Sequence, residues 1–132
     1  MRKFLFFLLC GTAFVYSADS LIVEARLTEI PGKMPGNDLY NYVYIFKYKV
    51  LKVVQGDFKG KEILVGVYNP KIPRGSVRDK MAESAKGNVR EFKANDKHRL
   101  ILVPMESVWK GALEDEYFDD EATRYFAREV IE

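Results

Sequence analysis

The chain has 132 residues, of which 48% are hydrophobic and 30% charged, and it carries 21 basic and 19 acidic residues. Two basic residues and the only cysteine, Cys10, lie in an expected export signal, so the remainder is formally neutral and lacks cysteine. This composition excludes disulfides and thiolate catalysis from the exported part, and it argues against nucleic acid as a partner.

The first 17 residues are typical of a secretory signal peptide, with Arg2 and Lys3 before the apolar run 4–10. Cleavage is expected after Ser17, or after Ala18 as the second choice. A retained anchor is disfavoured because the run falls short of the roughly 20 residues of a membrane span. A lipoprotein anchored through Cys10 is disfavoured. The signal peptidase that processes lipoproteins requires a small residue before the cysteine, and none precedes Cys10. We expect a periplasmic or secreted single domain, residues 18–132, without a membrane span after cleavage.

Charge is unevenly distributed along the exported part. Residues 71–99 carry nine basic and four acidic side chains, whereas residues 114–132 carry eight acidic and two basic ones. We expect these two segments to attract each other.

Apolar residues alternate with polar ones from Leu21 to Thr28, which is the two-residue period of a strand with one buried face. Glycine, proline, asparagine and aspartate concentrate in residues 30–38, which predicts an exposed loop.

Aromatic residues share one parity over residues 40–48, which predicts a long strand with an aromatic face. A stacking platform for sugar rings is the alternative to core. Alternation with Lys47 and Lys49 favours core, with Tyr40 and Tyr42 the most exposed members. Near Val50 and Leu51 the apolar residues change from even-numbered to odd-numbered positions, which predicts a bulge there.

The second half of the chain predicts three more strands. Residues 55–61 form a turn before a third strand at 63–67, and Pro104 ends a fourth strand at 100–103. A capped short helix is expected between them, within residues 76–87. Residues 118–131 fit either a helix or an edge strand. We favour a short helical turn at 119–123 followed by a fifth strand at 125–131 that covers an open sheet edge.

The pattern of Tyr48, Val50 and Val53, then Gly56, then strands at 63–65 and 100–102, resembles netrin-like OB-fold modules, the architecture of the tissue inhibitors of metalloproteinases. The resemblance covers residues 21–103. It implies a mostly β, five-stranded OB-like barrel with a short helix between the third and fourth strands. Those inhibitors bind the protease zinc through an amino-terminal cysteine, which the exported part of this chain lacks, so inhibition is not carried over.

OB barrels bind ligands on one outer sheet face and its bordering loops. The residues that we expect to form this ligand-binding face are Lys47, Lys49, Tyr68, Asn69 and Arg74. Arg74 is the preferred position, because its fork-shaped cation suits a carboxylate or a phosphate. Trp109 either borders the same surface or caps the barrel end, and the cap is favoured.

Other chemistry is weakly indicated. Two acidic runs, 114–116 and 119–121, do not have the alternate spacing of a calcium loop, so no metal is expected. His98, the only histidine, is expected to be an exposed polar residue, and the serines lack a nucleophile context. No cofactor is expected.

We therefore predict an exported, non-enzymatic binding module that recognises a cell-envelope protein or glycan. Two alternatives are a structural accessory subunit, docking through its acidic tail and basic loop on an envelope assembly, and a small carboxylate-dependent hydrolase.

Overall fold

The computed structural model describes residues 20–36 and 38–132, so the expected signal peptide lies outside the described residues. In these described residues strands dominate, and the two short helical segments are 3-10 turns. In chain order the elements are β1 (Leu21–Glu29), β2 (Val43–Gln55), β3 (Glu62–Tyr68), η2 (Ala82–Ser84), β4 (Lys86–Gly87), β5 (Lys97–Pro104), η3 (Met105–Ser107), β6 (Leu113–Glu114) and β7 (Arg124–Ile131).

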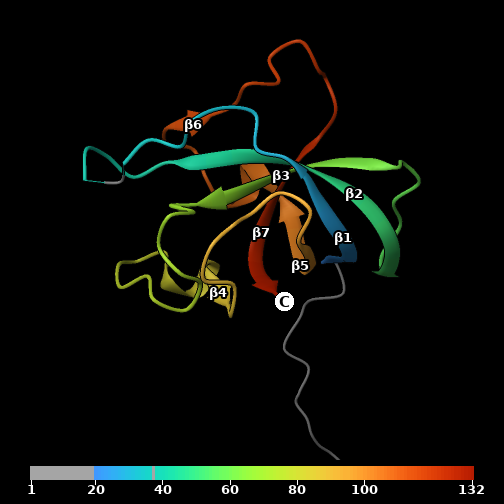
Figure 1. Cartoon of the computed structure of the whole chain (residues 1–132), viewed down its shortest axis with the longest axis horizontal. Helices are drawn as coiled ribbons and strands as arrows, with labels where there is room; N and C mark the ends of the chain where they lie inside the picture. The colour runs from blue at the N-terminus through green and yellow to red at the C-terminus, as the bar shows by residue number, and fades with distance from the viewer. Residues whose placement is uncertain (1–19, 37) are drawn as a thin grey trace, which may run out of the picture.

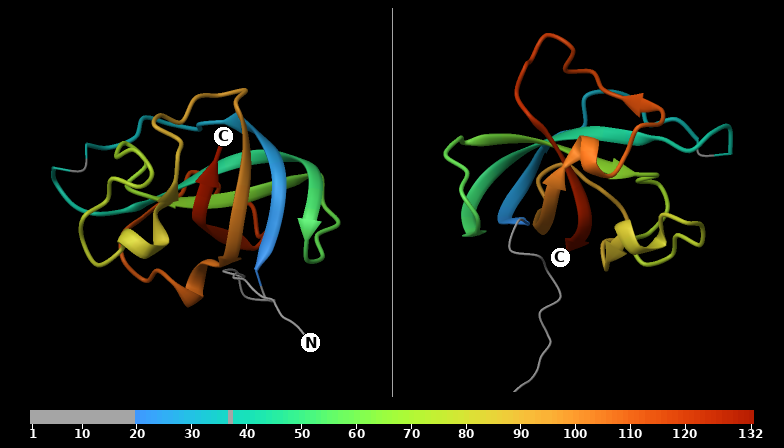
Figure 2. Two further views of the ribbon diagram at one scale, coloured as in Figure 1. Left: turned by 90° about the horizontal axis from the view of Figure 1, so that it is seen from below. Right: turned by 180° about the vertical axis from the view of Figure 1, so that it is seen from behind.

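Five strands close into a barrel in the order β1, β2, β3, β7, β5 and back to β1 (Figures 1 and 2). The pairing of β3 with β7 is parallel, and the other four pairings are antiparallel. The two short strands add to the outside, β6 beside β2 and β4 beside β7. The expected mostly β, OB-like barrel is confirmed, and β7 is the fifth strand that closes its edge.

The interior of the barrel is built largely from the aromatic face of β2. Phe46 and Tyr48 are fully buried, and Tyr44 is 2% exposed, as the alternation predicts. Tyr40 is 41% exposed as expected, but Tyr42 is fully buried, contrary to expectation. The hydroxyls of Tyr42 and Tyr44 explain how polar rings are tolerated there, because they donate to the carbonyls of Pro35 and Gly32 in the loop before β2.

The bulge expected near Val50 and Leu51 is confirmed. The pairing of β1 with β2 steps from Glu24 opposite Lys52 to Ala25 opposite Val50, so Leu51 is the extra residue. One extra residue flips the parity of the strand and increases its twist, which helps a long strand bend around a barrel.

The expected helix within 76–87 is reduced to the single 3-10 turn η2. Asp79 explains this, because its carboxylate accepts the backbone N–H of Met81 at 2.8 Å and offers the chain an alternative to helical bonding. The helical turn expected at 119–123 is also wrong: an isolated turn closes between Tyr117 and Asp120. Among the described residues no helix has the length and hydrophobicity to cross a membrane.

Candidate functional site

Side chains fill the barrel, which leaves its outer surface for a ligand site. The largest fully buried side chains include Tyr44, Phe46 and Tyr48 from β2 and Tyr42 directly before it. Phe92, from the loop before β5, stacks on Phe46 with ring centroids 5.2 Å apart and closes this end of the core. Interiors packed in this way leave little room for a ligand.

The outer face of β2 and β3 is covered by the chain itself. The apolar side chains of this face, together with those of the segments that pack on it, form a hydrophobic cluster separate from the barrel interior. It consists of Val43, Ile45, Leu64, Tyr68, Val77, Ala85 and Phe126. The segment after β5 lies over it, with Met105, Val108, Trp109 and Tyr117 packed against the cluster. The middle of the face on which OB barrels commonly bind is therefore occupied by the protein's own residues.

A groove remains at the margin of this covered face, and we call it the Trp109 groove. It has a volume of about 740 Å³. The residues that line it are Asn41, Tyr68, Asp79, Lys80, Met81, Glu106, Ser107, Val108, Trp109, Lys110 and Gly111. This volume is within the usual range for small-molecule sites of about 300–1,000 Å³.

Trp109 is held in place by one hydrogen bond from its backbone and one from its side chain. Its N–H donates to the carbonyl of Met105 at 3.0 Å, and its indole Nε1 donates to the carbonyl of Ala112 at 2.8 Å. The ring meets that of Tyr68 edge to face, with centroids 5.3 Å apart. The indole is half-buried, so part of its surface faces the groove while its one polar atom is already satisfied.

Tyr68 and Asp79 form the polar part of the groove floor. The Tyr68 hydroxyl donates to Oδ2 of Asp79 at 2.6 Å, and Oδ1 of the same carboxylate accepts the N–H of Met81. Burial, followed by this hydrogen bond to Asp79, raises the pKa of Tyr68. The hydroxyl therefore stays protonated and keeps Asp79 fixed as an acceptor at neutral pH.

The charges around the groove balance. Asp79 and Glu106 carry two negative charges, and Lys80 and Lys110 carry two positive ones. Such a rim offers donors and acceptors without a net field, so it suits a polar uncharged ligand better than a strongly anionic or cationic one.

The structure separates the five residues expected to bind a ligand. Lys47 and Lys49 are on the outer face of β2, but Lys47 is half-buried, with Nζ 5.0 Å from the centre of the Tyr117 ring. Tyr68, Asn69 and Arg74 are 1%, 1% and 4% exposed. The expected exposed face is therefore wrong as a single surface, and of the five only Tyr68 lines the groove. The roles of the other four in binding a ligand stay predictions.

Arg74 organises its own loop. Its NH2 atom donates to the carbonyls of Tyr68, Asn69 and Ile72 at 2.7–3.0 Å, and its guanidinium lies 5.9 Å from the centre of the Phe92 ring. Burial lowers the pKa of Arg74 to about 10. The neighbouring prolines suggested from sequence that Arg74 is exposed and recognises a ligand. In the structure they shape a loop that folds around the Arg74 side chain.

His98 is also not exposed as expected. It is 2% exposed, its Nδ1 lies 2.8 Å from the Tyr48 hydroxyl, and its ring meets those of Tyr48 and Phe92. Desolvation by burial lowers the pKa of His98, although Asp96 and Glu132 oppose the shift. Among residues 20–36 and 38–132 no three His, Cys, Asp or Glu side chains are placed to hold a metal ion.

Sequence reasoning named Trp109 as a border or a cap but missed the groove. The ring of Trp109 contacts that of Tyr68, but the single ligand-binding face that Trp109 was expected to border is not formed, so the choice between border and cap stays a prediction. The signal was the single tryptophan followed by Lys110 and Gly111, but nothing local shows that this segment folds back over β3.

Comparison of the chain with known protein families, with curated proteins and with solved structures finds no match.

Proposed function

We propose that this chain is an exported, non-enzymatic binding module, and that its ligand is a glycan of the cell envelope held in the Trp109 groove. The observation that carries the proposal is the half-buried indole of Trp109 beside Tyr68 in an open groove of about 740 Å³. Aromatic faces suit the apolar faces of sugar rings, and the surrounding carboxylate, amide and hydroxyl groups suit sugar hydroxyls. Kinship with netrin-like modules, export and a periplasmic or secreted location belong to the same proposal.

The chemistry of the groove favours binding over hydrolysis. Of its two carboxylates, Asp79 is already bonded by the Tyr68 hydroxyl and the Met81 N–H. Glycoside cleavage uses two carboxyl groups that are free to exchange protons or attack the sugar. Because the Asp79 carboxylate is held by hydrogen bonds within the groove floor, it is not free for these steps. This supports a non-enzymatic role.

A glycan is favoured over a protein segment for two reasons. The rim carries equal numbers of acidic and basic side chains, so it offers no charge that would select a peptide of one sign. The outer edge of β3 is paired with β7, and β2 is paired with β6 where the groove lies, so these strands offer no free edge there for an extended peptide.

The test uses the fluorescence of Trp109, which is the only tryptophan in the chain and therefore reports on this groove alone. The chain from Asp19 onward is titrated with soluble peptidoglycan fragments and with neutral oligosaccharides. We expect a saturable change in emission. Trp109→Phe keeps a smaller aromatic face and weakens binding modestly, as measured by calorimetry, whereas Trp109→Ala loses about 30-fold or more in affinity, as expected of a central aromatic anchor.

Phe118→Ser is the matched control, because it removes an exposed aromatic residue from the same segment outside the groove. Its affinity is expected to equal that of the wild type. Saturable glycan binding that survives Trp109→Ala unchanged contradicts the site. Absence of binding to every glycan, together with capture of a peptide in the groove, contradicts the glycan and favours a protein ligand.

A further inference from the structure

Phe118 is 80% exposed, more than any other large hydrophobic side chain in the described part of the chain. It is at the turn of residues 114–123, which we call the acidic loop because the residues around it include Glu116, Asp119, Asp120 and Glu121. Figures 1 and 2 show this loop as an orange to red arch that stands off the barrel. An isolated exposed hydrophobic residue is ordinary in a protein surface, so its setting decides whether it has a role.

The acidic loop is held rigidly by Arg124 at its end. The guanidinium donates to both carboxylate oxygens of Asp115, at 2.9 and 3.4 Å, and to the carbonyls of Tyr117, Asp120 and Ala122. The side chains of Arg124 and Asp115 are each only 17% exposed. A partly buried bidentate ion pair with three further carbonyl bonds fixes the path of the chain on both sides of Phe118.

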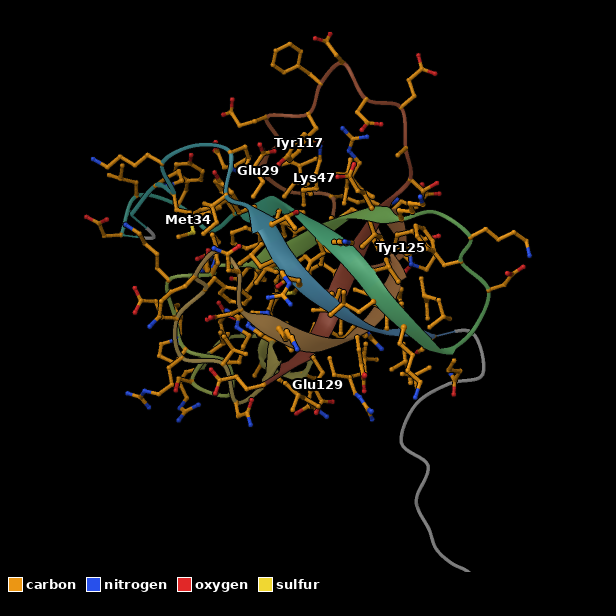
Figure 3. All side chains as sticks on the ribbon, turned by 45° about the vertical axis from the view of Figure 1, so that its right-hand side comes forward. Glu29, Met34, Lys47, Tyr117, Tyr125 and Glu129 are labelled. Carbon is orange, nitrogen blue, oxygen red and sulfur yellow. The ribbon has the colours of Figure 1, made fainter. Side chains whose placement is uncertain are left out.

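The base of the loop is fixed to the barrel as well. The Tyr117 hydroxyl donates to Glu29 from β1, and Nζ of Lys47 from β2 lies over the Tyr117 ring (Figure 3). Phe118 is therefore presented on a preorganised loop whose neighbouring residues are largely acidic. Preorganisation lowers the entropy lost on binding, and aromatic side chains are common anchors of interfaces.

A pocket of complementary chemistry lies elsewhere on the same molecule, and we call it the proline pocket. Its volume is about 430 Å³, and its lining consists of Met34, Pro70, Lys71, Pro73, Arg90, Glu91 and Phe92. Four of these side chains are apolar, and two of the three charged ones are basic. Five of its seven lining residues belong to the segment 71–99, in which nine basic side chains outnumber four acidic ones.

The two features do not meet within one molecule. Among the described residues no hydrogen bond or ion pair joins residues 114–121 to residues 71–99, and Phe118 remains exposed. The strand part of the acidic segment does meet the basic segment inside the fold, where Lys86 lies opposite Glu129 and the N–H of Glu132 donates to Asn88, but the acidic loop itself makes no such contact. A second copy of the chain offers each feature its complement.

We propose that this protein self-associates head to tail, with Phe118 of one copy inserted in the proline pocket of the next. Asp119 and Asp120 then face Lys71 and Arg90 of the neighbour. Because each copy keeps one free loop and one free pocket, the contact is heterologous and extends into short chains unless its rotation closes a ring. One loop in one pocket buries little area, so the association is weak and is screened by salt. It uses a surface separate from the Trp109 groove and does not depend on the proposed function.

The test is sedimentation velocity of the chain from Asp19 onward, over a wide range of protein concentration at low salt. We expect the average mass of the wild type to rise with concentration and to fall again when salt is added. Phe118→Ser alone, and Lys71→Glu with Arg90→Glu in a second variant, are each expected to remain monomeric. All three positions are exposed, so these variants should fold, and their thermal unfolding checks this.

Mixing the two variants provides the decisive measurement. The first variant keeps an intact pocket and the second an intact loop, so an equal mixture is expected to form dimers and nothing larger. Trp109→Ala is the control and should associate as the wild type does. A wild type that stays monomeric at every concentration overturns the proposal, as does a mixture that stays monomeric or a Phe118→Ser variant that still associates.

Discussion

Met105 packs directly over Gly66, so closely that a Cβ atom on Gly66 would lie 2.1 Å from Met105 Cε. The same Cβ would lie 2.7 Å from Val43 Cγ1, on the neighbouring strand. Gly66 is in the middle of β3, where glycine is unfavourable for the strand itself. The missing side chain makes room for η3 to lie on the sheet, and η3 leads directly into Trp109.

We predict that Gly66→Ala destabilises the protein by about 1–3 kcal/mol, the usual cost of an extra methyl group in a packed core. Urea unfolding measures this directly. Adding Met105→Ala should recover only part of the loss, because the contact with Val43 remains. The Trp109 emission should shift to longer wavelength in Gly66→Ala, because lifting η3 exposes the indole.

Gly32→Ala is the control for this prediction. A Cβ there meets its nearest atoms at 3.6 and 3.7 Å, which is ordinary contact distance, and the residue has no positive φ. Its stability should remain within about 0.5 kcal/mol of the wild type. Equal losses from both substitutions would show that the packing of Met105 on Gly66 has no special role.

A second prediction concerns Arg124, which holds the acidic loop. Arg124→Lys keeps the charge but cannot bond the Asp115 carboxylate and three carbonyls together, so we expect a loss of about 1–3 kcal/mol in urea unfolding. Hydrogen exchange of the amides at 117–122 should accelerate more than exchange in β7. Arg128→Lys, an exposed arginine of the same strand, should change neither quantity.

The strands could be predicted from the sequence because burial in a barrel leaves a period of two. Tyr44, Phe46 and Tyr48 share one parity and are buried, and the change of phase at Leu51 marks the extra residue in β2. These signals are local, since each depends on which side of one strand faces the core. The closing strand at 124–131 was found in nearly its full length for a different reason, because a fifth strand was needed to cover an open sheet edge.

The candidate site could not be predicted because it depends on long-range packing. Arg74 looks like a loop cation in sequence, and only the fold shows three carbonyls converging on it. Trp109 contacts Tyr68, which is 41 residues earlier in the chain, and no spacing rule links the two positions. The expected helix at 76–87 does not form, because the backbone N–H of Met81 bonds the Asp79 side chain.

A third prediction follows from the position of Arg74. Arg74→Lys should destabilise the protein by about 1.5–3 kcal/mol, because the shorter lysine side chain does not place its ammonium group where Nη2 meets the three carbonyls and so leaves buried carbonyls without a donor. Thermal or urea unfolding tests this. Arg90→Lys is the control, since Arg90 is exposed, and its stability should not change measurably. A loss of ligand affinity by Arg74→Lys without any loss of stability would instead support direct recognition.

The last prediction concerns the pH dependence of stability through His98. Burial holds the pKa of His98 below the ordinary value of 6.5 that applies in the unfolded chain, so between these two pKa values the unfolded state binds more protons than the folded one. Stability is therefore fully present above about pH 6.5 and is lost as the pH falls below it, by up to about 1.4 kcal/mol per pH unit. Glu24 also has a lowered pKa, caused first by its hydrogen bond from Arg99, but the pH range in which it affects stability lies below its ordinary pKa of 4.5.

His98→Gln should remove this dependence, because glutamine can still bond the Tyr48 hydroxyl and does not titrate. Urea unfolding at about pH 7.5 and about pH 5.5 compares the two proteins within the histidine window and above that of Glu24. The wild type should lose stability between these values, whereas the variant should change little. An equal loss in both proteins would mean that another group governs this range and that His98 does not stay neutral in the folded barrel.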